Sequence, residues 1–242
     1  MKNFIIKMTE REGLLYLIFQ DLKYKFGKFL NLYNFILRKK RINEFLLKNK
    51  KINIQFGAGS GKLGEARKSV LETFLNTDIF GHIPIDINSN LPFKKDTVDI
   101  IFSSHLIEHI FQRKADLFFK ESYRVLKNKG NLIIATPTIE KMVEILYGKN
   151  IKFKNQIYSE HLNSFLGRPP TPARLINAMT HINYGHKFLF DYETLKDLAI
   201  KNGFTIFDKV TINNVKDSDI RNYLKSKNHN YKLQTEIFLA IK

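Results

Sequence analysis

Hydrophobic and polar positions divide the chain into zones of different periodicity. Over residues 1–50, apolar side chains recur at helical spacing, with basic residues between and after them. Over 51–148, short β-rich runs alternate with helical stretches, which is typical of parallel βαβ units. Residues 149–190 are irregular and contain several turn signals, and 191–242 return to one helix and two strands. The pattern predicts a helical extension and one α/β domain over 51–242, with an inserted, lid-like segment at about 149–190.

The strand and helix boundaries follow from local signals. One helix is expected from Glu108 to Leu126, with Lys129 and Gly130 as its C-terminal cap. A second begins at an Asp191 cap and ends near Asn202. The runs predicted to be strands are Lys51–Phe56, Thr73–Asp78, His82–Ile87, Val98–Ser103, Leu132–Ala135, Phe204–Val210 and Thr235–Ile241.

Composition narrows the classes of partner. The net charge is +17, but lysine is scattered and arginine is scarce, so we attribute most of the charge to compositional drift and disfavour nucleic acid. The basic stripe in 1–50 leaves two hypotheses open: packing on the domain or on a second copy as a homodimer, or peripheral contact with an anionic membrane. There is no cysteine, no apolar run of about 18 residues and no secretory signal pattern at the start, so we expect a cytoplasmic protein, with the inner membrane face as the alternative site.

A glycine-rich loop directly follows the first predicted strand. Gly57, Ala58, Gly59 and Gly61 lie in this loop, where glycine allows a tight turn and close approach of a ligand. Asp78 ends the second predicted strand. A carboxylate about 20 residues after such a glycine loop is where a ribose diol is held. The spacing of the glycines does not match the dinucleotide fingerprint, and no Gly-Lys-Ser or Gly-Lys-Thr of a Walker loop occurs at the required spacing. The loop therefore indicates a nucleoside ligand of another kind.

An ordered set of motifs resembles the class I S-adenosylmethionine (SAM)-dependent methyltransferases. The motifs are INIQFGAGSG, NTD, IDINSNLPFKKDTVDIIFSSHLIEHI and ESYRVLKNKGNLIIATP. They cover about residues 51–137, and the resemblance resumes at 185–191 and 203–204. The nearest group is a small bacterial one often found with polysaccharide and glycosyltransferase genes. The resemblance implies a Rossmann-like, doubly wound, mostly parallel sheet with an antiparallel final strand, and SAM as the cofactor.

The resemblance also implies roles for individual residues. The glycines would pack against the methionine part of SAM, Asp78 would bind the ribose, and Asp86 would lie near the adenine amino group with Ile87 beside the ring. Gln55 stands where many members carry an acid; it can bond the ammonium group but supplies no counter-charge. The predicted cofactor contacts are Gln55, Gly57, Ala58, Gly59, Gly61, Asp78, Ile79, Asp86, Ile87, Ser103 and Ser104.

Histidine is the first candidate for acid–base chemistry. His105 follows the predicted strand 98–103 and is the candidate base for deprotonating an acceptor, whereas Glu108 and His109 are interpreted as capping or locking a helix. The order His-Leu-Ile-Glu-His is not a zinc-protease motif, and no metal ligand set is predicted. The remaining histidines of interest are interpreted as surface residues of the insertion: His161, His181 and His186.

These observations predict an enzyme that transfers a methyl group from SAM to an oxygen or nitrogen of a small or sugar-type acceptor. A role in cell-surface polysaccharide biosynthesis is implied by the resemblance alone. Two alternatives remain. The first is an RNA methyltransferase, suggested by the charge, although no aromatic-rich RNA module and no Asn-Pro-Pro-Tyr signature occur. The second is a non-catalytic methyltransferase-like binding protein, for which Gln55 is the hint and the retained Asp78 and Asp86 are the counter-argument.

Overall fold

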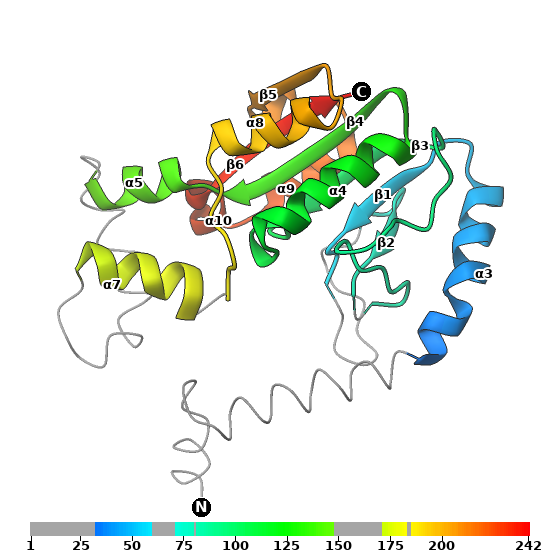
Figure 1. The fold of residues 1–242 in the computed structure, drawn as a ribbon, viewed down its shortest axis with the longest axis horizontal. Coiled ribbons are helices and arrows are strands. Elements are labelled where there is room, and N and C mark those ends of the chain that lie inside the picture. Colours follow the sequence, from blue (N-terminus) through cyan, green and yellow to red (C-terminus); the bar gives the residue numbers. More distant parts are fainter. Residues whose placement is uncertain (1–31, 60–70, 80, 148–170, 183–184) are drawn as a thin grey trace, which may run out of the picture.

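The computed structural model shows one mixed sheet with helices on both faces (Figure 1). The residues it describes are 32–59, 71–79, 81–147, 171–182 and 185–242. The first 31 residues of the predicted extension, and the part of the predicted insertion up to 170, therefore lie outside the described residues.

Six strands form the sheet in the order β2-β1-β3-β4-β6-β5. The first four run parallel, and β6 is antiparallel to both β4 and β5. This confirms the predicted mostly parallel sheet with an antiparallel final strand. The strands are β1 (Asn53–Phe56), β2 (Leu75–Thr77), β3 (Val98–Ser104), β4 (Leu126–Pro137), β5 (Ile206–Val210) and β6 (Thr235–Ile241).

Helices cover the two faces because the central strands are apolar on both sides. Phe118 of α4 and Leu198 of α8 are buried with Ile54 of β1 in the main core. On the opposite face, Leu224 of α9 is buried with Phe102 of β3. The helices are α3 (Leu32–Lys48), α4 (Gln112–Val125), α5 (Ile139–Tyr147), α7 (Pro172–Asn177), α8 (Tyr192–Lys201), α9 (Ser218–Ser226) and α10 (His229–Gln234), with short helical turns at Ile107–His109, Ala178–Ile182 and Ile212–Asn214.

Two peripheral parts attach to this frame. Ile42 of α3 is buried in the main core, so the described end of the predicted N-terminal helix packs on the domain. Helices α5 and α7 share a small core of their own, which includes Met142 and Leu175. None of the helices in the described part of the chain combines the length and apolar character needed to cross a bilayer.

The strand predicted at His82–Ile87 is wrong. Ile83, Ile85 and Ile87 are buried in the main core, so the alternating apolar side chains mark the buried side of this segment. The backbone, however, forms only an isolated bridge between Asp78 and Pro84. Proline has no N–H to donate to a ladder, so the segment lies extended on the core without becoming a strand.

The predicted boundaries of the helix at 108–126 also need correction. The helix α4 begins at Gln112, and Ile107–His109 is a separate turn. Leu126 is the cap residue at the end of α4, and Gly130 lies within β4 rather than ending the helix. A Cβ on Gly130 would approach the Lys127 carbonyl oxygen to 2.8 Å. The glycine therefore serves a tight bend at the start of β4 instead of a helix cap.

Residues 172–182, predicted to be irregular, are helical. The Thr171 hydroxyl accepts a hydrogen bond from the Arg174 N–H, and Pro172 occupies the first turn, where its missing N–H costs nothing. The proline was thus a helix-start signal. Two further helices, α9 and α10, were not predicted; Asp217 and Asn228 cap them.

Gly203, predicted to end the second helix, does follow α8 with φ +102°. A Cβ there would lie 2.8 Å from Cζ of Tyr123. We expect Gly203→Ala to lower the free energy of unfolding by about 2–4 kcal/mol, the sum of left-handed strain and overpacking. Gly185→Ala is the matched control, because Gly185 has φ +66° with nothing within 4 Å of the added Cβ. Urea unfolding of both variants separates strain from collision; equal losses would contradict the steric part.

Candidate functional site

The glycine loop and the end of β2 meet at the carboxyl edge of the sheet. Gly57 and Gly59 have φ of +71° and +83°, a region that favours glycine. The Gly59 N–H donates to Oδ2 of Asp78 at 2.9 Å, and the Ala58 N–H donates to the Thr77 carbonyl oxygen at 3.0 Å. The structure thus brings together the predicted loop and the predicted ribose carboxylate. Gly61 lies outside the described residues.

This edge fits a nucleoside cofactor. A Cβ on Gly57 would lie 3.0 Å from Cδ1 of Leu106, so the backbone is pressed against its neighbour and only glycine keeps the space open. Ala58 is buried and closes the loop against the core, whereas Ile79 is 37% exposed beyond Asp78. Ligands of open α/β sheets bind outside the carboxyl ends of the strands, which is where these residues lie.

Gln55 and the two serines occupy neighbouring strands. Gln55 is buried in β1, in register with Asn76 and Phe102 on either side. Ser103 and Ser104 are buried at the carboxyl end of β3, and Ser104 Oγ is hydrogen-bonded to the Tyr231 hydroxyl at 2.6 Å. The predicted polar residues therefore lie in the sheet at or just below the edge where the glycine loop turns.

Asp86 opens a turn at the end of the segment 83–87. Its Oδ1 accepts hydrogen bonds from the backbone N–H and the side-chain amide of Asn88, both at 2.9 Å. Ile87 is buried in the main core. The segment is tied to the predicted ribose-binding residue, since the Ile85 N–H donates to the Asp78 carbonyl oxygen. Asp78 and Asp86 thus follow one another along one edge.

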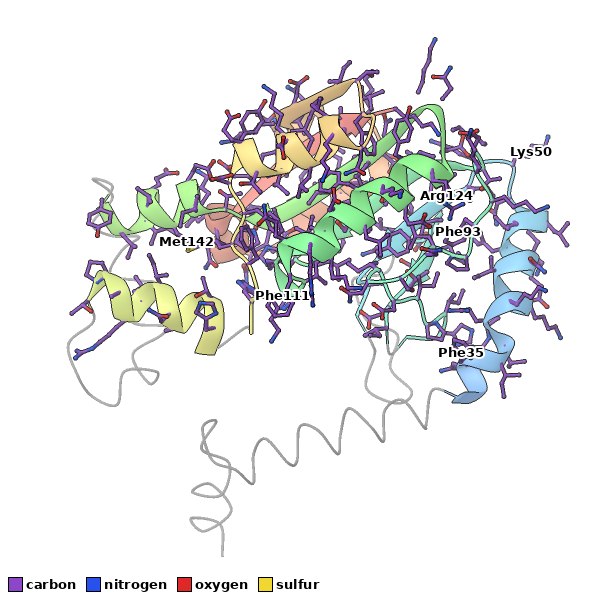
Figure 2. All side chains as sticks on the ribbon, viewed as in Figure 1. Phe35, Lys50, Phe93, Phe111, Arg124 and Met142 are labelled. Carbon is purple, nitrogen blue, oxygen red and sulfur yellow. The ribbon has the colours of Figure 1, made fainter. Side chains whose placement is uncertain are left out.

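Two side chains of α4 hold the Leu-Pro-Phe segment that follows Asp86. Glu121 Oε2 accepts from the Leu91 N–H at 2.8 Å and from the Arg124 guanidinium at 2.6 Å. The same guanidinium donates to the carbonyl oxygens of Leu91 and Phe93, both at 2.9 Å. Figure 2 shows Arg124 beside Phe93. The LPF and ESYRVL motifs are therefore joined by hydrogen bonds. We call Glu121 and Arg124 the clamp, because they hold the loop that contains Leu91 and Phe93.

His105 lies at the end of β3 with the left-handed φ of +50°. Its Nε2 is hydrogen-bonded to Thr235 Oγ1 at 2.7 Å, and its ring stacks on Tyr231 at a centroid distance of 4.6 Å. Burial, with a smaller contribution from the neighbouring histidines, lowers the pKa of His105 to about 3. The predicted base is thus an oriented, uncharged imidazole. Tyr231 and Thr235 were not predicted, because they lie 126 and 130 residues further along the chain.

Glu108 is fully buried beside this imidazole. Its Oε2 accepts from the Thr136 hydroxyl at 2.9 Å, and Oε1 lies 3.5 Å from His105 Nδ1 and 4.0 Å from His186 Nε2. Burial raises the pKa of Glu108 to about 8. Glu108 therefore does not cap a helix, and His186 is a buried residue, in contrast to the predicted surface position.

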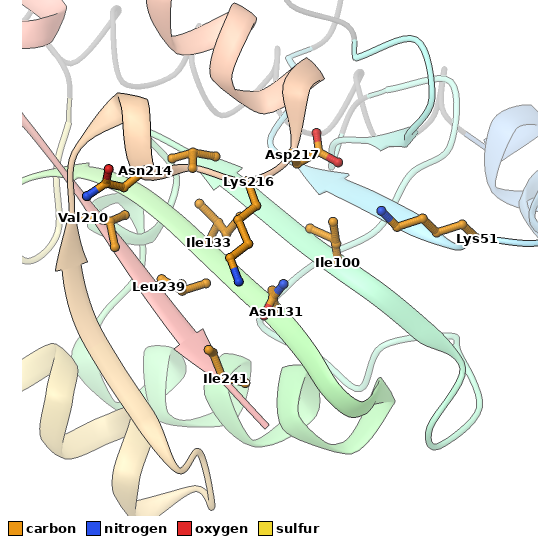
Figure 3. A pocket seen from close by; sticks show the side chains of 11 residues that line it. Lys51, Ile100, Asn131, Ile133, Val210, Asn214, Lys216, Asp217, Leu239 and Ile241 are labelled. Atoms are coloured by element: carbon orange, nitrogen blue, oxygen red, sulfur yellow. The ribbon is translucent and has the colours of Figure 1, made fainter.

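Hollows on the described surface include one away from the candidate site and one beside it. The larger, about 290 Å³, lies over one face of the sheet and is lined by Lys51, Asn131 and Lys216 among others, and by none of the predicted cofactor contacts (Figure 3). The smaller, about 200 Å³, is lined by Tyr231 and Thr235, the two partners of His105. Only the smaller one borders the residues of the candidate site.

Comparison with known proteins agrees with these observations. Residues 65–134 match the model of a family described as a methyltransferase domain. No curated protein sequence matches the chain.

Solved structures similar to the chain include the CurJ carbon methyltransferase (13% identity, 79% of this chain and 48% of that one, TM-score 0.45). Others are a Haemonchus contortus phosphoethanolamine N-methyltransferase (17%, 83% and 53%, 0.42) and an Archaeoglobus fulgidus SAM-dependent methyltransferase (16%, 94% and 99%, 0.47). The chain spans about half the length of the first two.

The strand order and the glycine-loop edge define a doubly wound nucleotide-binding class of fold. Within that class, the matched part of the chain, residues 65–134, is similar to a methyltransferase domain.

Proposed function

We propose that this chain transfers a methyl group from SAM to an oxygen or nitrogen of a small or sugar-type acceptor. The observation that carries the proposal is the tie between Gly59 and Asp78 at the sheet edge, with His105 at the end of the neighbouring strand β3. The predicted role in cell-surface polysaccharide synthesis belongs to the same proposal and is supported by the sequence resemblance alone.

The residues at the carboxyl edge of the sheet would hold SAM. Gly57 and Gly59 would hold the methionine part, and Asp78 and Asp86 the ribose and the adenine. When bound, SAM supplies an electrophilic methyl group on a sulfonium centre. The contribution of the protein is mainly alignment, because the leaving group is already activated.

His105 would take the proton that an acceptor hydroxyl or amine loses. The imidazole is fixed by the Thr235 hydroxyl and the Tyr231 ring, so Nε2 points to one defined place. An acceptor hydroxyl that reaches Nε2 would replace the Thr235 hydroxyl as its partner. The hollow of about 200 Å³ is lined by Tyr231 and Thr235, the two partners of His105, and not by His105 itself, so an acceptor in it would reach Nε2 only by displacing one of them.

Calorimetric titration with SAM and with S-adenosylhomocysteine tests the cofactor half. We expect micromolar binding of both by the wild-type protein. A folded protein that binds neither would overturn the proposal and favour the non-catalytic alternative.

The acceptor half is tested with methyl-labelled SAM and a panel of free sugars, nucleotide-linked sugars, small amines and RNA. We expect label in a sugar or an amine. Label in RNA alone would favour the RNA methyltransferase instead.

Replacing the predicted base should separate chemistry from binding. His105→Asn keeps a residue that tolerates the φ of +50°. We expect kcat to fall by about 100-fold or more with the Kd for SAM unchanged. Thr235→Val, which keeps the imidazole but removes its hydroxyl partner, should reduce kcat less. An unchanged kcat in His105→Asn would show that His105 does not take the proton of the acceptor.

A further inference from the structure

Three potential metal ligands converge beside the end of β3. Donor atoms of Glu108, His109 and His186 all lie within 4.8 Å of one another. Glu108 and His109 come from the turn after β3, and His186 from the segment before α8, so the tertiary fold brings them together. One carboxylate oxygen and two imidazole nitrogens form a donor set that suits zinc and other first-row divalent cations.

The second observation is the state of the Glu108 carboxylate. The side chain is completely buried, and Oε1 has no hydrogen-bond partner among the described residues. This oxygen faces imidazole nitrogens, at 3.5 Å from His105 Nδ1 and 4.0 Å from His186 Nε2. A buried carboxylate oxygen is costly unless a donor or a cation meets it. A cation between Glu108 and His186 would meet it.

The groups behind the ligands are also in place. The Thr136 hydroxyl fixes Glu108 through Oε2, which leaves Oε1 for the cation. His109 is hydrogen-bonded to the backbone of Gly185, the kind of outer contact that orients a metal-ligating imidazole. The Glu108 carbonyl oxygen accepts from the Lys187 N–H at 2.7 Å, which holds the residue next to His186 against the turn.

We propose that Glu108, His109 and His186 bind one divalent cation of the zinc type. Donors around tetrahedral zinc are roughly 3.3 Å apart, so the 4.0 Å between Glu108 Oε1 and His186 Nε2 needs to close by less than 1 Å. His109 is exposed, whereas Glu108 and His186 are buried, so a cation would enter the site from the side of His109. The proposal rests on this geometry and does not require the proposed acceptor.

Metal titration of the full chain tests the site. The protein is stripped with a chelator and dialysed, then titrated with Zn²⁺ by calorimetry and with Co²⁺ by absorption spectroscopy. We expect one Zn²⁺ per chain, and Co²⁺ d–d bands of tetrahedral or five-coordinate intensity. The absence of binding to folded wild-type protein at millimolar Zn²⁺ would overturn the proposal.

Variants locate the cation. Glu108→Gln and His186→Gln should each weaken Zn²⁺ binding by about 100-fold or more, since each removes a ligand whose outer partners alone are worth about tenfold to 100-fold. His82→Gln is the control, because His82 is exposed and outside the ligand set. Zn²⁺ binding that all three variants retain equally would place the cation elsewhere and contradict the site. If a ligand variant does not fold, the Co²⁺ spectrum of the wild type decides, because tetrahedral or five-coordinate ligation by nitrogen and oxygen gives stronger d–d bands than the octahedral aquo ion.

Discussion

Asp78→Ala is expected to weaken SAM binding by about 100-fold or more. The substitution removes the carboxylate that would accept both ribose hydroxyl protons, and hydrogen bonds to a charged group contribute about 1.5–3 kcal/mol each. It also removes the acceptor of the Gly59 N–H, so the loop loses its tie to the end of β2. Calorimetric titration of the variant with SAM and S-adenosylhomocysteine measures the loss.

Two further variants make the result specific to the ribose contact. Asp78→Asn keeps an oxygen that can accept from the Gly59 N–H but turns the other atom into a donor, so it should lose most of the affinity while keeping the loop. Asp96→Asn is the matched control: Asp96 precedes β3 at the opposite end of the strand and tolerates asparagine at its φ of +58°. Wild-type affinity for SAM in Asp78→Ala would show that Asp78 does not contact the cofactor.

The meeting of the glycine loop with Asp78 at one edge of the sheet could be predicted because its signals are local. Gly57 and Gly59 adjoin β1, Asp78 adjoins β2, and parallel neighbouring strands end at the same edge of a sheet. No tertiary information is needed to bring these residues together once the strands are assigned. The same reasoning succeeded for β5, α8 and β6, whose caps and alternation are contained in short windows.

The surroundings of His105 could not be predicted in this way. Glu108 meets His186 because the segment before α8 is hydrogen-bonded to the Glu108 carbonyl oxygen, and no periodicity in either segment shows that contact. Tyr231 and Thr235 reach His105 because β6 pairs antiparallel with β4 beside β3. The local signal for Glu108, its place in His-Leu-Ile-Glu-His, was compatible with a helix cap as well as with a buried ligand.

Proline shows how a local signal can mislead in both directions. Pro84 interrupts a run that alternates like a strand, and Pro172 begins a helix in a segment that resembles a loop. In both places the ring removes one N–H, and its effect depends on whether that N–H had a partner to lose. The family resemblance did not correct the assignment of either segment, because its most specific motifs lie in the strands and in α4.

The largest effect on stability is expected from Glu121→Ala. The substitution leaves the Leu91 N–H and the Arg124 guanidinium without their carboxylate. Because the Glu121 side chain is buried but that of Arg124 is 34% exposed, we expect a loss of about 3 kcal/mol, the lower end of the cost of breaking a buried ion pair. The hydrogen bond from Arg124 holds the pKa of Glu121 below its ordinary value of 4.5. The contribution is therefore complete above pH 4.5 and is lost as the pH falls through the lowered pKa. Urea unfolding at pH 7 and at acid pH should show wild type and variant converging in acid.

The control for this prediction is another ion pair with the same sequence separation. Lys141 and Glu144 are also three residues apart, but the Glu144 side chain is 66% exposed, so Glu144→Ala should cost less than about 1 kcal/mol. Glu121→Ala should in addition weaken SAM binding, because the clamp holds Leu91 and Phe93 in the loop that follows Asp86. A variant that is destabilised by the full amount yet binds SAM with wild-type affinity would show that the clamp serves the fold alone and that the loop after Asp86 does not position the cofactor.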